Sequence, residues 1–83
     1  EFTFMETPGH TQGGICICGD GKIFTGDTLF FRSIGRTDLY SGNMEQMRKS
    51  LQKLMRLPDE IQVLPGHGPD TSIGAEKKGN PFV

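Results

Sequence analysis

Histidine, cysteine and tyrosine are scarce in this sequence and tryptophan is absent, and neither charge nor hydrophobicity is concentrated along it. The 83 residues include two histidines, two cysteines, one tyrosine and no tryptophan. Nine basic and ten acidic side chains leave a net charge of -1, so we expect neither a nucleic acid nor a membrane as partner. No apolar run approaches the roughly 20 residues of a membrane span, and the first residues lack a signal-peptide pattern. A chain of this length forms one domain at most.

The two cysteines, Cys16 and Cys18, lie two residues apart in an apolar run. In a strand both would point to the same face, with Cα atoms about 6.6 Å apart, near the upper limit for a disulfide. We expect them to be reduced and buried, which favours a cytoplasmic location. A metal-binding Cys-x-Cys pair is the alternative interpretation.

The sequence begins at Glu1 and runs directly into a strand-like segment. Natural domains rarely begin inside an element, so we expect a piece cut from a longer chain. A processed natural N-terminus is the alternative.

Apolar periodicity and turn signals divide the chain into alternating elements. Gly19-Asp20-Gly21, between two apolar runs, predicts a tight hairpin. Asn43 is a good N-cap, Gln46 fits a capping box, and apolar residues then recur at spacings of three and four, which predicts a helix. We expect strands near 2–5, 14–18, 22–25 and 61–64, and helices near 44–56 and 72–78. This order predicts an α/β fold in which a mixed sheet carries helices on one face.

Three further expectations concern the segment after the hairpin and the two helices. Residues 28–42 have no clean period but contain aromatic residues, so we expect a long ordered loop, and such loops are usually functional. The basic residues of the 44–56 helix are expected to form a solvated face, with a basic binding patch as the alternative. Thr71 or Ser72 is expected to cap the last helix.

Three side chains share a setting that indicates a metal site. His10 in TPGHT, Asp27 in TGDT and His67 in PGHG each follow directly on the end of an expected strand. Imidazole and carboxylate together are ligands for zinc, iron or manganese, and Asp27, with two oxygens, is able to bridge two ions. Thr11 and Thr28 directly follow two of these residues and are expected to orient them by hydrogen bonds. Taken singly, each ligand has a plainer interpretation as a surface histidine or a turn aspartate.

The ordered segments TPGHT, FTGDTLF and VLPGHGP resemble the metallo-β-lactamase-fold hydrolases. Within them the sequence is most similar to the hydroxyacylglutathione hydrolase (glyoxalase II)-like branch, which SIGR after GDTLF and the ending EKKGNPF also resemble. The resemblance implies that residues 1–83 are the C-terminal part of a single domain, half of an αββα sandwich. It also implies that the N-terminal half, with the family's HxHxDH metal motif, is absent.

By this resemblance His10 binds one metal ion, His67 binds the other, and Asp27 bridges them as the catalytic carboxylate. Two zinc ions are implied, with iron or manganese as alternatives. A metal-bound hydroxide would attack a thioester of the hydroxyacylglutathione type. Arg36 matches a basic position that contacts the substrate, although a salt bridge with Asp38 is an equal alternative.

Other reactions of the same fold remain open, namely lactone hydrolysis, persulfide oxidation by a single iron, or a non-catalytic or swapped module. Three ligand side chains are too few for two ions, so we expect the 83-residue chain alone to have little or no hydrolase activity. Half of a sandwich leaves one face of its core uncovered, which predicts self-association or pairing with the missing half.

Overall fold

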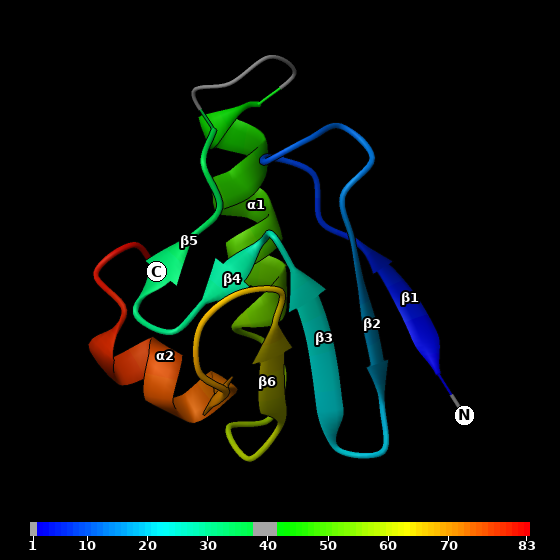
Figure 1. Ribbon diagram of the computed structural model, residues 1–83, viewed down its shortest axis with the longest axis vertical. Helices are drawn as coiled ribbons and strands as arrows, with labels where there is room; N and C mark the ends of the chain where they lie inside the picture. Colours follow the sequence, from blue (N-terminus) through cyan, green and yellow to red (C-terminus); the bar gives the residue numbers. More distant parts are fainter. Residues whose placement is uncertain (1, 38–41) are drawn as a thin grey trace.

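A five-stranded mixed sheet organises the chain. The computed structural model describes residues 2–37 and 42–83. The strands of the sheet, in spatial order, are β1 (Thr3–Glu6), β2 (Ile15–Gly19), β3 (Lys22–Gly26), β6 (Gln62–Pro65) and β7 (Thr71–Ser72). Strand β3 pairs with β6 in parallel, and the other neighbours are antiparallel. A separate two-stranded hairpin is made by β4 (Leu29–Phe30) and β5 (Ser33–Ile34) (Figure 1).

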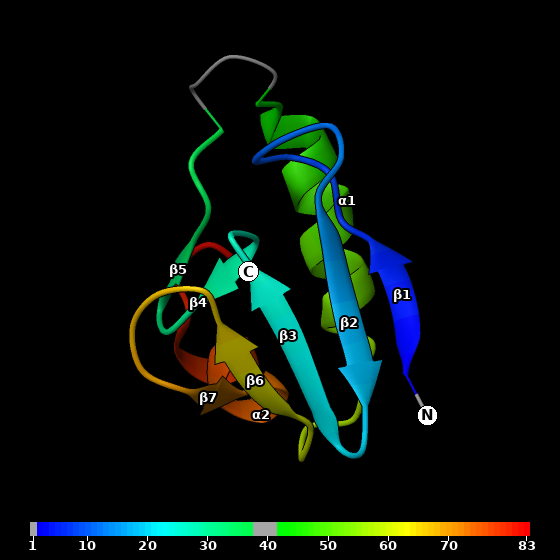
Figure 2. The ribbon, with the colours of Figure 1, turned by 45° about the vertical axis from the view of Figure 1, so that its right-hand side comes forward.

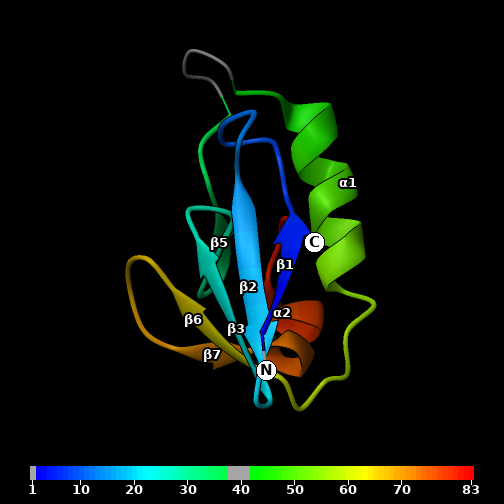
Figure 3. The ribbon, with the colours of Figure 1, turned by 90° about the vertical axis from the view of Figure 1, so that its right-hand side faces the viewer.

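Two helices, α1 (Met44–Leu54) and α2 (Ile73–Gly79), pack on the same face of the sheet, as Figure 3 shows. The core between them and the sheet consists of eight buried apolar residues: Cys16, Ile23, Leu29, Met47, Leu51, Leu54, Val63 and Ile73. The expected α/β fold with helices on one face is therefore confirmed.

The opposite face of the sheet carries a row of apolar side chains. Phe4, Ile17, Phe24 and Leu64 are consecutive partners across β1, β2, β3 and β6, so they lie on the same face. Phe4 is 72% exposed and Phe24 43%. The segment Ile15–Cys18 is apolar on both faces, which is typical of a strand covered on both sides, but among the described residues the helices cover one of its sides.

The expected elements occur with bounds shifted by one or two residues. Asp20 and Gly21 have φ of 53° and 73°, as a two-residue hairpin turn requires, so the expected hairpin is confirmed. Asn43 caps α1, because its side chain accepts a hydrogen bond from the backbone of Gln46 at 2.9 Å. Ser72 caps α2. The expected loop 28–42 contains the β4–β5 hairpin, whose two-residue strands are too short to show a period.

Candidate metal centre

The strands bring three loops to one edge of the sheet. Strands β1 and β3 both run antiparallel to β2, and β6 runs parallel to β3. The C-terminal ends of β1, β3 and β6 therefore lie at the same edge, where Figure 2 shows all three arrowheads pointing the same way. His10, Asp27 and His67 are on the loops that leave these ends.

The two histidines face different oxygens of the same carboxylate. His10 Nε2 lies 3.8 Å from Asp27 Oδ2, and His67 Nε2 lies 3.5 Å from Asp27 Oδ1. Two ligands of one tetrahedral zinc ion, each at 2.0–2.2 Å, are about 3.4 Å apart. Each histidine–carboxylate pair is thus spaced close to what two donors of one ion require, and the nitrogen and oxygen donors fit such a metal.

His10 is oriented by the backbone. Its Nδ1 lies 2.8 Å from the carbonyl oxygen of Arg36. A carbonyl only accepts hydrogen bonds, so Nδ1 is the donor in this contact, and Nε2 is the nitrogen that faces Asp27 and is placed to bind a metal ion. Metal-binding histidines are usually held in this way by a partner on the second nitrogen.

The loop of His10 is fixed on the first turn of α1. The carbonyl of Gly9 accepts a hydrogen bond of 2.7 Å from the backbone N–H of Asn43. Gly9 has a φ of +146°, and an added Cβ would lie 2.5 Å from the Cα of Met47, so only glycine allows this approach. Because the N–H of Asn43 is used here, the reciprocal bond of a capping box is not formed. Gln46 Oε1 has no hydrogen-bond partner within residues 2–37 and 42–83.

Asp27 and His67 are brought together by two glycines. Gly26 has a left-handed φ of 51°, and its carbonyl accepts a hydrogen bond of 2.9 Å from the N–H of Gly66. The turn after β3 is thereby tied to the turn after β6. The ring of Phe30 lies 5.8 Å from the His67 ring, centroid to centroid, which supports an imidazole that is otherwise 81% exposed.

The threonines near the ligands differ in their positions. Thr28 is buried, and its hydroxyl lies 3.1 Å from that of Thr7, which in turn lies 3.3 Å from Cys16 Sγ. Burial raises the pKa of the Cys16 thiol, although hydrogen bonds from the two threonines oppose the effect, and both cysteines are free. The buried position of Thr7 is not predictable from sequence, because a threonine ahead of a proline carries no signal of its own. Thr11 is exposed, and its backbone carbonyl accepts from Gly9.

Arg36 is exposed and lies beside the site through its backbone. A role of its side chain in substrate binding remains a prediction. The alternative, a salt bridge with Asp38, lies outside the described residues.

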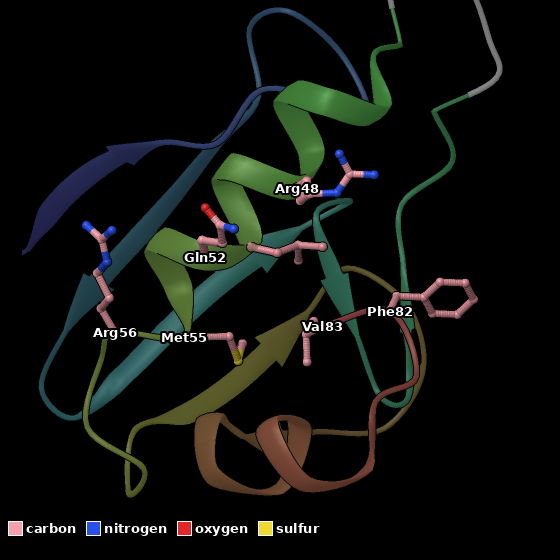
Figure 4. A pocket seen from close by; sticks show the side chains of 7 residues that line it. Arg48, Gln52, Met55, Arg56, Phe82 and Val83 are labelled. Carbon is pink, nitrogen blue, oxygen red and sulfur yellow. The ribbon is translucent and has the colours of Figure 1, made fainter.

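A hollow of about 710 Å³ lies away from the three candidate ligands, none of which lines it. Figure 4 shows it beside α1 and the end of the chain. Its lining consists of Arg48, Leu51, Gln52, Met55, Arg56, Phe82 and Val83.

The described residues do not complete a metal site by themselves. Among them, no group of three or more histidine, cysteine, aspartate or glutamate side chains is placed to hold one ion. Each of the two pairs at Asp27 offers two donors, whereas zinc usually takes four ligands.

No helix in the described part of the chain is long and apolar enough to cross a membrane.

Comparison with known proteins gives consistent matches. The model of the Metallo-beta-lactamase superfamily matches residues 1–67. A probable metallo-hydrolase of Streptococcus pyogenes serotype M6 is 47% identical over 85 residues, covering 99% of this chain and 37% of that protein. Hydroxyacylglutathione hydrolase GloC of Haemophilus influenzae is 45% identical over 86 residues, covering 100% of this chain and 41% of that protein.

A solved structure agrees with these sequences. The crystal structure of TTHA1623 in a di-iron-bound form superposes with a TM-score of 0.97 at 39% identity, covering 99% of this chain and 42% of that one. The chain therefore spans about two fifths of the length of these relatives. With its family model matched over most of its length and its fold shared with these proteins, the chain belongs to the metallo-β-lactamase superfamily.

Proposed function

We propose that this chain supplies three ligands to the binuclear centre of a metal-dependent hydrolase. His10 would bind one ion, His67 the other, and Asp27 would bridge them. The observation that carries this proposal is the placement of the two Nε2 atoms against different oxygens of Asp27, at 3.8 and 3.5 Å. A carboxylate that served only one histidine would not need both of its oxygens to face imidazoles.

The proposed substrate is a thioester of the hydroxyacylglutathione type. The 45% identity with GloC supports this class. When bound, the ions would supply a water of lowered pKa and polarise the substrate carbonyl. The chain's own contribution is to orient His10 through the Arg36 carbonyl and to present Asp27, half exposed, to the reacting groups. The Arg36 side chain would contact the substrate's peptide portion.

Zinc is the proposed metal because imidazole and carboxylate suit it, with iron as the second candidate. The similarity to TTHA1623, which was crystallised in a di-iron-bound form, supports iron. Iron would also admit the alternative function, oxidation of a persulfide. Metal analysis of the chain after growth with both metals available distinguishes the two.

We further propose that the uncovered sheet face binds a second sheet of the same fold. The apolar row of Phe4, Ile17, Phe24 and Leu64 is a contiguous hydrophobic surface, and such surfaces usually mark an interface with another protein segment. The relatives have about three fifths of their length outside the matched region, which is enough chain to supply both that sheet and the missing ligands. A second copy of this chain is the alternative occupant.

Metal binding and turnover, measured on the same sample, test the proposed function. We expect the 83-residue chain to bind zinc weakly, to show no thioester hydrolysis, and to lose zinc binding in Asp27→Asn. Asp20→Asn, the same chemical change at an exposed position in the β2–β3 turn, is the control and should bind as the original chain does. Unchanged zinc affinity in Asp27→Asn refutes the bridging role, and tight binding of two ions with turnover refutes the claim that the chain is incomplete.

A further inference from the structure

The β4–β5 hairpin and the residues that flank it lie beside all three candidate ligands. The hairpin begins two residues after Asp27 and ends two residues before Arg36, whose carbonyl holds His10 Nδ1 at 2.8 Å. Between these ends, Phe30 of β4 packs on the His67 ring. The hairpin is therefore connected to each of the three ligands, in addition to the backbone bonds of Gly9 and Gly26 described above.

The tip of the hairpin is fastened to α2 by a buried carboxylate. The side chain of Glu76 is fully buried, and it accepts four hydrogen bonds. The donors are the backbone N–H of Arg32 at 2.8 Å, Arg32 Nη1 at 2.7 Å, Thr71 Oγ1 at 2.6 Å and Asn80 Nδ2 at 2.9 Å. Arg32 is at the tip and has a left-handed φ of 58°, a conformation that costs energy in a non-glycine residue and needs such support.

Neighbouring contacts leave this tip little freedom. The Arg32 guanidinium also donates to the carbonyl of Ala75 at 3.0 Å, and Asn80 Nδ2 donates to the carbonyl of Ser33 at 3.0 Å. A Cβ added at Gly79 would lie 2.6 Å from Arg32 Nε, so the side chain is packed directly against the end of α2. The tip of the hairpin and the start of β5 are thus bound to α2 and its C-cap residue, Asn80.

The carboxylate is ionised in this setting. Burial alone would raise the pKa of Glu76, but hydrogen bonds from Thr71, the Arg32 N–H and Asn80, together with the Arg32 charge, lower it below its usual value. An ionised group that is buried and fully bonded specifies one geometry, because any other arrangement leaves a charge without partners.

We propose that Glu76 is a positioning residue for the metal site, acting through the β4–β5 hairpin. Its hydrogen-bond partners are Arg32, Thr71 and Asn80, none of which is a candidate metal ligand. By holding Arg32 and, through Asn80, Ser33, it keeps the Arg36 carbonyl on His10 and Phe30 on His67. This inference rests on the proposed function, since it assigns Glu76 a role toward the metal ligands.

Glu76→Gln tests the proposal, because it keeps the size of the side chain but removes its charge. Asp59→Asn is the matched control: it removes the surface contact of 2.6 Å between Asp59 and Lys77 of α2, which does not involve the hairpin. The first readout is the ring ¹⁵N spectrum of His10 in the metal-free chain, which reports which nitrogen carries the proton. The second is zinc affinity by calorimetric titration at a temperature where each variant is folded.

We expect Glu76→Gln to mix the His10 tautomers and to weaken zinc binding about 10- to 100-fold, the usual effect of changing a group behind a metal ligand. Asp59→Asn should change neither. Arg32→Lys keeps the backbone hydrogen bond to Glu76 but loses the guanidinium, so it should give a smaller change in the His10 spectrum and in zinc affinity, in the same direction. This variant replaces Glu76→Gln as the test if Glu76→Gln does not fold.

Two results separate failure of the inference from failure of the proposed function. An unchanged His10 spectrum and unchanged zinc affinity in a folded Glu76→Gln chain, or in Arg32→Lys, would overturn the positioning role while leaving the metal site intact. If the original chain binds no zinc at millimolar concentration, the proposed metal site is refuted, whatever the His10 spectrum shows.

Discussion

Gly35→Ala is expected to disturb the metal site more than any other single methyl group. Gly35 is buried where the end of the β4–β5 hairpin passes behind two ligands. An added Cβ would lie 1.8 Å from the carbonyl oxygen of Asp27 and 3.2 Å from the Cβ of His10. Ordinary contact needs about 3.5 Å, so these backbones must separate by well over 1 Å. Metal ligands tolerate displacements of only about 0.2 Å.

The expected cost of this overpacking is about 1–3 kcal/mol in stability and at least a tenfold loss of zinc affinity. Thermal unfolding measures the first and calorimetric titration the second. Gly13→Ala is the matched control, because an added Cβ at Gly13 meets nothing within 4 Å. If Gly35→Ala binds zinc as tightly as Gly13→Ala does, the backbone around Asp27 and His10 is not what fixes the ligands, and the reasoning is wrong.

Three further predictions concern the core, the buried carboxylate and the uncovered face. Leu54→Ala, at a fully buried position, should cost about 2–5 kcal/mol in urea unfolding, and a loss below about 1 kcal/mol would contradict the core assignment. Because the folded pKa of Glu76 is lowered, its contribution to stability is present above the ordinary pKa of about 4.3 and is lost as the pH falls through the lower folded value. Melting curves should therefore show a drop below about pH 4 that Glu76→Gln lacks. Phe24→Asp, on the exposed apolar row, should reduce self-association in sedimentation experiments while changing the stability of the monomer by no more than about 0.5 kcal/mol.

The convergence of the three ligands could be predicted from sequence because each follows a strand of clear pattern. Once β1, β3 and β6 run in the same direction within one sheet, the loops of His10, Asp27 and His67 lie at the same edge. The pattern also located the turn at Asp20, because Gly19-Asp20-Gly21 stands between two apolar runs. Local signals of this kind need no knowledge of tertiary contacts.

The role of the β4–β5 hairpin could not be predicted in this way. Its two-residue strands are too short for periodicity, and its main support, Glu76, lies 44 positions from Arg32. Glu76 instead looks like an ordinary surface residue of a short helix, because glutamate is rarely buried unless it is paired. Thr7 was missed for a similar reason: its bond to Thr28 spans 21 positions.

The two histidines are held unequally, and this difference predicts an order of metal binding. His10 is 27% exposed and hydrogen-bonded through Nδ1 to a backbone carbonyl, whereas His67 is 81% exposed and supported by the Phe30 ring. Fixing His67 on an ion therefore costs more side-chain entropy. In a zinc titration followed by NMR, the His10 ring signals should respond at lower zinc concentration than those of His67. If His67 responds first, the orientation of His10 by the Arg36 carbonyl does not prepare it for metal, and preorganisation is not what distinguishes the two halves of this site.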